Sequence, residues 1–204
     1  MRPDSALLVG PLQADRRLVL LHGWGADADD LLELANELLG PGGDEVSVVA
    51  LRAPLPHPGG FGRQWYDLGQ PDWPQLPAAR ADLLNRLQDL SRSVPMERTA
   101  LLGFSQGAAM AIDVATSSGL PLAGLIGCSG YPHPGWVPQR PLCPILLTHG
   151  TEDPVVPYGS CGALETCLKD SGGTVETLAF SGGHGIDPGL FPAMRGFLVR
   201  AWQG

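Results

Sequence analysis

Short apolar runs alternate with helical patterns along the whole chain, and no other feature of the sequence constrains the fold as strongly. Residues 18–21 are a continuous apolar run, and residues 46–51 are mostly apolar, as expected for buried strands. Between such runs, apolar residues recur at helical spacing, as at Leu83, Leu87 and Leu90. Strands that alternate with helices form a parallel sheet that is covered on both faces. The sequence therefore predicts the α/β class, with a mostly parallel central sheet and helices on both faces.

The same alternation places the remaining elements. Further strands are expected at 5–9 (on a sheet edge), 99–102, 122–126, 144–147 and 174–180. Helices are expected at about 31–39, 83–94, 105–118 and 158–170, and a last helix that begins at Asp187 or Pro192 is expected to run to Trp202. Asp29 and Asp30 are candidate caps of the first helix, which Gly40 is expected to end. The stretch 54–77 is rich in Pro and Gly and is expected to be a long loop.

Composition and charge exclude several classes of protein. The chain has 204 residues, of which 44% are hydrophobic, so it can bury a core and is expected to form one domain over residues 1–204. Its net charge of −8 argues against a nucleic-acid backbone or an anionic membrane surface as the main partner. No apolar run approaches the roughly 18 residues of a membrane span, so no stable membrane insertion is expected, and the run 6–9 is too short for a signal peptide. The four cysteines form no CxxC pair, which favours reduced thiols and a cytoplasmic location.

The ends of the expected strands are where a ligand site should be sought, because parallel α/β sheets bind ligands at the carboxyl ends of their strands. The segment Gly103-Phe104-Ser105-Gln106-Gly107 follows the strand at 99–102 and fits the pattern G-x-S-x-G. In this pattern the serine lies on a strained turn between strand and helix, and the flanking glycines let the backbone pass closely. Ser105 is thus the candidate nucleophile. The alternative is a serine that only caps the helix.

Two further strand ends supply a carboxylate and an imidazole. Asp153 and His184 each lie just after an expected strand, and His184 has a glycine on both sides. A carboxylate can hold an imidazole in one tautomer and stabilise its charged form, and that imidazole can activate a serine. The order Ser105, Asp153, His184 along the chain is the order found in α/β-hydrolases. Glu152 is the alternative carboxylate, whereas Asp187 follows His184 too closely to orient it easily and is expected to cap the last helix.

The other histidines are expected to have structural roles. His22 and His149 directly end apolar strands and are expected to hydrogen-bond to the backbone there. His57 and His133 lie beside prolines, away from the expected position of a base. No two histidines lie within one helical turn, and no Cys/His cluster occurs, so neither a metal nor another cofactor is expected.

Five short stretches carry a resemblance to a known family. They are Leu21-His22-Gly23-Trp24-Gly25-Ala26-Asp27, Trp65-Tyr66-Asp67, Gly103-Phe104-Ser105-Gln106-Gly107, His149-Gly150-Thr151-Glu152-Asp153-Pro154-Val155-Val156-Pro157 and Gly183-His184. In this order, over residues from about 18 to 188, the chain resembles the carboxylesterase and acyl-protein thioesterase (lysophospholipase-like) family of α/β-hydrolases. The resemblance implies an α/β-hydrolase fold without a cap domain and a serine hydrolase that cleaves esters through an acyl-enzyme.

The resemblance also assigns roles to individual residues. It implies that Ser105 is the nucleophile, that His184 is the base and that Asp153 orients this base. It further implies an oxyanion hole made by the backbone N–H groups of Trp24 and Gln106. This agrees with the rule that the residue after the nucleophile donates one hydrogen bond and an early loop the other.

Substrate preference is less constrained by the resemblance. Trp65 falls at the family's aromatic position near the acyl site, with the alternative that it only anchors the long loop. Ala108 replaces the family's second glycine after the nucleophile, the loop after Trp24 is acidic and short, and residues 69–77 also depart from the usual form. Small-molecule esters of short to medium acyl chains are the expected substrates, because an acidic surface is poorly suited to anionic bilayers. Thioesters on proteins and lysophospholipids are the alternatives; the sequence does not predict the oligomeric state.

Two functions of other classes compete with ester hydrolysis. Residues 23–28 fit the dinucleotide-binding pattern G-x-G-x-x-A, but Asp27, Asp29 and Asp30 would repel a pyrophosphate at the start of the helix. No acidic residue follows the strand at 46–51 to bind a ribose. The second competitor is an inactive hydrolase fold that only binds a ligand, which the complete set of serine, aspartate and histidine disfavours.

Overall fold

A seven-stranded sheet forms the centre of the molecule in the computed structural model, which describes residues 5–40, 43–140 and 142–203. Its strands are β1 (Ala6–Val9), β2 (Arg16–Leu21), β3 (Val46–Leu51), β6 (Thr99–Phe104), β7 (Gly124–Cys128), β8 (Ile145–Gly150) and β9 (Val175–Phe180). They lie in the order β1-β3-β2-β6-β7-β8-β9, and only β1 is antiparallel to its neighbour. The mostly parallel sheet predicted from the sequence is confirmed, as is the edge position of its first strand.

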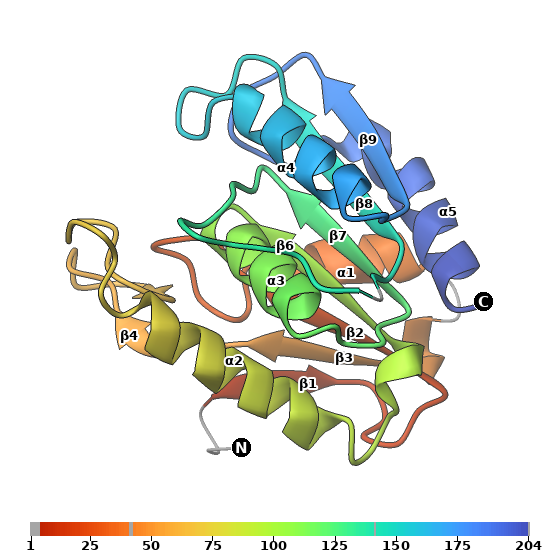
Figure 1. The fold of residues 1–204 in the computed structure, drawn as a ribbon. Coiled ribbons are helices and arrows are strands. Elements are labelled where there is room, and N and C mark those ends of the chain that lie inside the picture. Colours follow the sequence, from red (N-terminus) through yellow and green to blue (C-terminus); the bar gives the residue numbers. More distant parts are fainter. Residues whose placement is uncertain (1–4, 41–42, 141, 204) are drawn as a thin grey trace.

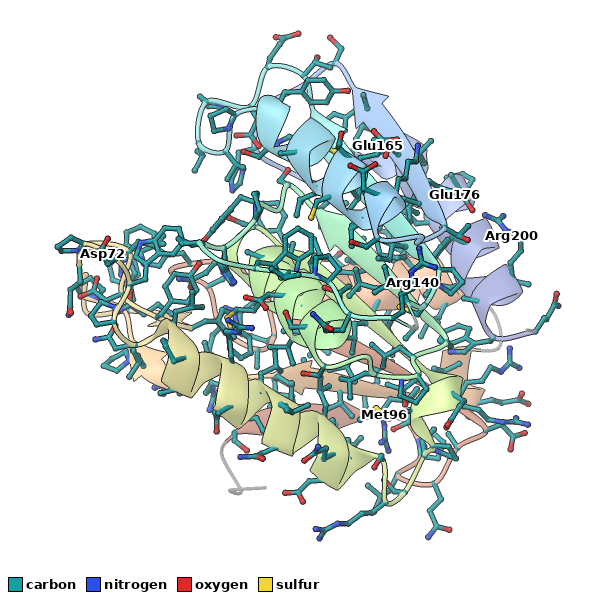
Figure 2. All side chains as sticks on the ribbon, in the orientation of Figure 1. Asp72, Met96, Arg140, Glu165, Glu176 and Arg200 are labelled. Atoms are coloured by element: carbon teal, nitrogen blue, oxygen red, sulfur yellow. The ribbon has the colours of Figure 1, made fainter. Side chains whose placement is uncertain are left out.

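Helices cover both faces of this sheet (Figure 1). The α-helices in the described residues are α1 (Leu32–Leu39), α2 (Leu76–Leu90), α3 (Gln106–Ser117), α4 (Gly159–Asp170) and α5 (Phe191–Ala201). The buried residues of α2, α3 and α4 pack on one face, and those of α1 and α5 pack on the other, which gives two apolar cores separated by the sheet. On the sheet edge formed by β9, Glu176 pairs with Arg200 of α5 at 2.8 Å, and Figure 2 shows these two side chains next to each other.

Strand register brings the carboxyl ends of the parallel strands to one edge of the sheet. Leu21 of β2 lies opposite Gly103 of β6, and Phe104 lies opposite Cys128 of β7. Further along, Gly150 at the end of β8 lies opposite Phe180 at the end of β9. The segments that follow β2, β6, β8 and β9 therefore begin at neighbouring positions, although they are far apart in the sequence.

The first helix differs from its sequence-based description at its start. Its N-cap is Leu31, and neither Asp29 nor Asp30 caps it with a side chain. Instead, Leu32 N–H donates to the backbone carbonyl of Asp29, and Asp30 N–H donates to that of Asp27. The backbone turn at Asp29 thus satisfies Leu32 N–H, one of the donors that an aspartate cap would serve. Gly40 ends the helix with a φ of 59°, as predicted.

The stretch 54–77 is shorter as a loop than the sequence predicts, because α2 already begins at Leu76. Within it, β4 (Leu55–Pro56) and β5 (Arg63–Gln64) pair as a small antiparallel hairpin. At the other end of the chain, a short 3-10 turn at Pro188–Leu190 precedes α5, and Asp187 caps this turn by accepting from Gly189 N–H; the last helix, which the sequence predicts Asp187 to cap, has Leu190 as its N-cap. In the part of the chain that the structure describes, no helix is long and apolar enough to cross a membrane.

Candidate active site

Ser105 occupies a sharp turn between β6 and α3 that the surrounding backbone leaves little freedom to change. Its φ of 54° and ψ of −119° lie in a region that residues other than glycine rarely adopt. A Cβ atom at position 107 would overlap the carbonyl oxygen of Leu21 in β2, so this position requires glycine. Ser105 N–H donates to Cys128 O at 2.8 Å, which fastens the turn to β7. The sequence pattern around Ser105 thus reflects close contact between backbone segments.

Asp153 lies in the segment after β8 with both carboxylate oxygens engaged. Its Oδ1 accepts from the N–H groups of Val155 and Val156 at 2.8 and 2.9 Å, which fixes the orientation of the side chain. Burial alone would raise the pKa of this carboxyl, but the hydrogen bonds from His184 and from the two backbone N–H groups outweigh burial and lower the pKa. Asp153 is therefore an ionised carboxylate at neutral pH.

His184 connects this carboxylate to Ser105. Its Nδ1 lies 2.7 Å from Asp153 Oδ2, and its Nε2 lies 2.9 Å from Ser105 Oγ. The loop that carries His184 packs on the end of β8, where a Cβ at position 150 would overlap the carbonyl oxygens of Gly182 and Gly183. The His184 side chain is 16% exposed, so solvent reaches it. The structure thus brings together the three side chains that the sequence analysis selected.

The alternative residues at these strand ends have other partners. Glu152 accepts a hydrogen bond from Ser181 Oγ at 3.0 Å and does not face His184. His22 is held by backbone groups on both ring nitrogens, since Nδ1 lies 2.8 Å from Gly23 O and Nε2 accepts from Ala53 N–H at 3.1 Å. Burial lowers the pKa of His22, although the hydrogen bond to Gly23 opposes this shift, so its ring stays neutral.

His149 also contacts the backbone, as predicted for a histidine that ends a strand. Its Nε2 lies 2.9 Å from Val156 O. The same nitrogen is 3.3 Å from Asp153 Oδ2, which makes His149 a second neighbour of the carboxylate that faces His184.

A second histidine–carboxylate pair lies inside the protein and was missed by the sequence analysis. His133 Nδ1 is 2.6 Å from Asp113 Oδ2, and both side chains are almost fully buried. His133 Nε2 faces the hydroxyl of Tyr66 at 3.0 Å, and Tyr66 shares a 2.6 Å hydrogen bond with Tyr131. In the part of the chain that the structure describes, no serine is a hydrogen-bond partner of this imidazole, which separates it from the arrangement at His184. The two partners are 20 residues apart, and no local sequence pattern marks such a pair.

The backbone N–H groups of Trp24 and Gln106, which the family resemblance implies as oxyanion donors, have no hydrogen-bond acceptor among the described residues. Trp24 follows β2, Gln106 begins α3, and neither N–H donates to a protein group among the described residues. The side chains of Trp24 and Gln106 bind residues 64–66, which belong to the segment between β3 and α2, called the 52–75 segment below. Trp24 Nε1 donates to Gln64 Oε1 at 2.8 Å. The Gln106 amide accepts from Trp65 N–H at 2.9 Å and donates to Tyr66 O at 2.8 Å.

Trp65 itself is buried, with 1% of its surface exposed. Its indole N–H donates to His22 O at 3.0 Å, directly before the loop that carries Trp24. This placement favours the interpretation in which Trp65 anchors the long loop over the one in which it forms the floor of an acyl groove.

The cysteines are poor candidates for a nucleophile. All four are free, and Cys128, Cys143 and Cys161 are buried. Burial raises the pKa of Cys128 and of Cys143 to about 12, and that of Cys161 to about 11, so these thiols stay protonated at neutral pH. Among the residues that the structure describes, no group of three or more His, Cys, Asp or Glu side chains could hold a metal ion.

Comparison with known proteins agrees with this geometry. The sequence model of the phospholipase/carboxylesterase family matches residues 6–201. The chain belongs to this family. Acyl-protein thioesterase 1 of Neurospora crassa is 27% identical over 88% of this chain and 81% of its own length. Esterase YpfH of Escherichia coli is 28% identical over 92% of this chain and 84% of its own length.

Among solved structures, the esterase PE8 superimposes on this chain with a TM-score of 0.86. The two are 28% identical, and the match covers 97% of this chain and 98% of PE8. Fold and relatives together identify the chain as an α/β-hydrolase enzyme of the esterase type, which acts on esters.

Proposed function

We propose that this chain is a serine hydrolase that cleaves carboxylic esters of short to medium acyl chains through an acyl-enzyme, with Ser105, His184 and Asp153 as catalytic triad. The observation that carries the proposal is the continuous path from Asp153 Oδ2 through the imidazole of His184 to Ser105 Oγ, with donor–acceptor distances of 2.7 and 2.9 Å. Nucleophile, base and orienting carboxylate are within hydrogen-bond reach of one another, as covalent catalysis requires.

The first half of the reaction would form the acyl-enzyme. Ser105 Oγ attacks the ester carbonyl carbon while its proton passes to His184 Nε2. Asp153 holds Nδ1–H of the imidazole and stabilises the imidazolium, because its own carboxyl stays ionised. The N–H groups of Trp24 and Gln106 would stabilise the negative charge that develops on the carbonyl oxygen by donating hydrogen bonds to it. When the C–O bond breaks, His184 Nε2–H returns the proton to the leaving alkoxide, and an alcohol departs.

The second half would release the acid. A water molecule gives its proton to His184 Nε2 and attacks the acyl carbon of the ester that links the substrate to Ser105. Collapse of this intermediate breaks the bond to Oγ, which takes the proton back, and a carboxylic acid leaves. Because His184 is partly exposed, the site offers water a direct approach for this step.

Exposed aromatic residues beside the oxyanion loop supply apolar surface for an acyl or alcohol group. Trp24 is 44% exposed and Phe61 is 77% exposed; Trp24 meets the ring of His57 edge-on at a centroid distance of 4.1 Å, and the tilted ring of Phe61 lies 6.3 Å from it. This cluster of Trp24, His57 and Phe61 supports a preference for esters with a modest apolar group.

Replacement of the nucleophile tests the proposal. Ser105→Ala should lower esterase turnover by about 10³-fold or more, because no acyl-enzyme can form. Ser118→Ala, in the exposed cap at the other end of α3, is the matched control and should keep full activity. A fluorophosphonate probe should label wild type and Ser118→Ala but not Ser105→Ala. If Ser105→Ala keeps a tenth of the wild-type turnover, the proposal is wrong.

Thioester hydrolysis is the second candidate, supported by the name of the Neurospora relative. The same triad would serve both reactions, so the leaving group decides between them. A panel of oxygen esters and thioesters with matched acyl chains of graded length distinguishes the two. Higher kcat/KM for the oxygen esters at short and medium length supports our proposal, and a preference for long-chain thioesters supports the alternative.

A further inference from the structure

A cleft lies on the α2 side of the sheet, away from Ser105. It has a volume of about 990 Å³ and is bordered by α2, by the end of β3 and by the following residues up to Trp65. Neither Ser105 nor His184 lines it. Its volume is within the range of small-molecule sites in proteins. Besides Arg63, four charged residues border the cleft: Arg52, Asp82, Arg86 and Asp89.

The cations and anions around the cleft do not balance. Arg52 pairs with Asp27 at 2.6 Å, and Arg86 pairs with Asp82 at 2.7 Å. Asp89 pairs with the exposed Arg92, one turn further along the helix end, at 3.2 Å. Arg63 has no carboxylate partner among the described residues, and it is therefore the cation that remains in the cleft.

Arg63 is held in a fixed position by backbone atoms. Its Nε donates to Ala53 O at 2.8 Å, and one Nη donates to Pro54 O at 2.7 Å. Its own backbone is hydrogen-bonded to the loop that follows β2, since Arg63 N–H donates to Ala26 O and Arg63 O accepts from Gly25 N–H. The second terminal nitrogen of the guanidinium has no hydrogen-bond partner in the described part of the chain. A guanidinium ordered in this way can bind an anion without first losing side-chain freedom.

Apolar side chains also line the cleft, together with the polar Ser5, Gln75 and Asn85. Pro54, Leu55, Trp65 and Ala79 contribute to it. An inorganic anion would leave this surface uncovered, whereas a carboxylate with a hydrocarbon body would cover it and pair with Arg63. We infer that the cleft between α2 and residues 52–65 is a binding site for small monocarboxylates with an apolar body, anchored by Arg63. Acids of this kind are also what the proposed ester hydrolysis releases, but binding itself does not depend on that reaction.

Calorimetric titration with hexanoate tests the site, with hexanamide as the neutral ligand of similar shape. The protein is Ser105→Ala, so that catalysis plays no part in the result, and wild type blocked with a fluorophosphonate serves as a second sample. We expect saturable binding of hexanoate in the millimolar range to both samples. Hexanamide should bind at least about tenfold more weakly, because it lacks the charge that pairs with Arg63.

Two variants in the Ser105→Ala background locate the ligand. Arg63→Gln removes the cation, and Ala78→Phe narrows the cleft from the exposed surface of α2 while it keeps Arg63 in the sequence. Each should weaken hexanoate binding at least about tenfold. Arg140→Gln is the matched control, because this exposed arginine lies outside the cleft, beside the end of α4 (Figure 2), and should leave binding unchanged.

Several outcomes would overturn the inference. They are the absence of saturable binding, equal affinity for hexanoate and hexanamide, and binding that survives Ala78→Phe. Ala78→Phe keeps the test decisive if Arg63→Gln does not fold. A failed fluorophosphonate reaction would count against the proposed function alone, because the titration of Ser105→Ala still reports on the cleft.

Discussion

The nucleophile turn at 103–107 and the 52–75 segment both border the candidate active site, but they are held in place in different ways. The turn is fixed by backbone packed against backbone, as shown by the overlap that a Cβ at position 107 would make with Leu21 O. The 52–75 segment has one such contact, between Gly62 and Gly25. Apart from backbone hydrogen bonds such as those of Arg63 with Gly25 and Ala26, it is held by side chains, above all Gln106 and Trp24, that bind it across about 40 residues of sequence. Chemistry is therefore built on the rigid part, and the neighbouring surface is attached to it.

The largest effect should come from replacing Asp153, the carboxylate that pairs with His184 beside the nucleophile turn. Asp153→Asn should lower kcat by up to about 10⁴-fold, because the wrong tautomer of His184 is favoured and the imidazolium loses its partner. Glu152→Gln is the matched control and should change kcat only a few-fold, since Glu152 binds Ser181. Steady-state kinetics on one ester measures both. The reverse ranking would show that Glu152 orients the base.

The next largest effect is expected from removing Trp65, the buried residue that anchors the 52–75 segment. Trp65→Ala should lower the free energy of unfolding by about 3–5 kcal/mol, the usual cost of removing a large buried aromatic side chain. Because Trp65 is buried and binds His22 O, we expect the dependence of kcat/KM on acyl-chain length to stay the same. Urea denaturation and an ester panel measure the two quantities. A changed profile with little loss of stability would instead place Trp65 against the acyl chain, as the family resemblance implies.

A third change tests whether the nucleophile turn depends on backbone contact. Gly107→Ala should lower the free energy of unfolding by about 3 kcal/mol, since the obstacle is the backbone of β2 and has little room to move. Gly162→Ala is the control on the exposed side of α4, where a Cβ meets nothing within 4 Å. This control should be neutral or slightly stabilising, because alanine favours helix over glycine. Equal stability of both variants would contradict a turn that requires glycine at position 107.

The smallest effect concerns pH and the ionised carboxylate of Asp153. The pKa of Asp153 is lower in the folded protein than the ordinary value of about 3.9, so the unfolded chain binds its proton more readily. Its contribution to stability is present above that ordinary value and is lost as the pH falls through the folded-state pKa. The difference in unfolding free energy between wild type and Asp153→Asn should therefore shrink below about pH 4. A difference that grows on acidification would mean that the pKa is raised instead.

The sequence predicted the rigid part of the site well and the attached part poorly. The turn, the strand ends and the order of the three side chains follow from local patterns and from the rule that parallel strands end at one edge. The contacts of Gln106 with Trp65 and Tyr66, and the pair of His133 with Asp113, join residues that are distant in sequence. No periodicity or motif marks such contacts. The prediction that Asp29 or Asp30 caps α1 was wrong for a local reason, because the backbone forms hydrogen-bonded turns at 27–32 instead.

The way in which Gln106 holds its neighbour has a consequence for how the enzyme can change over evolutionary time. Its amide recognises the N–H of residue 65 and the C=O of residue 66, and every amino acid except proline supplies the first of these groups while all supply the second. These two hydrogen bonds involve only backbone atoms of residues 65 and 66, so they do not depend on the side chains there. Mutations that reshape the 52–75 segment can therefore accumulate while its attachment to the nucleophile turn persists, so substrate preference can drift without rebuilding the chemistry beside it.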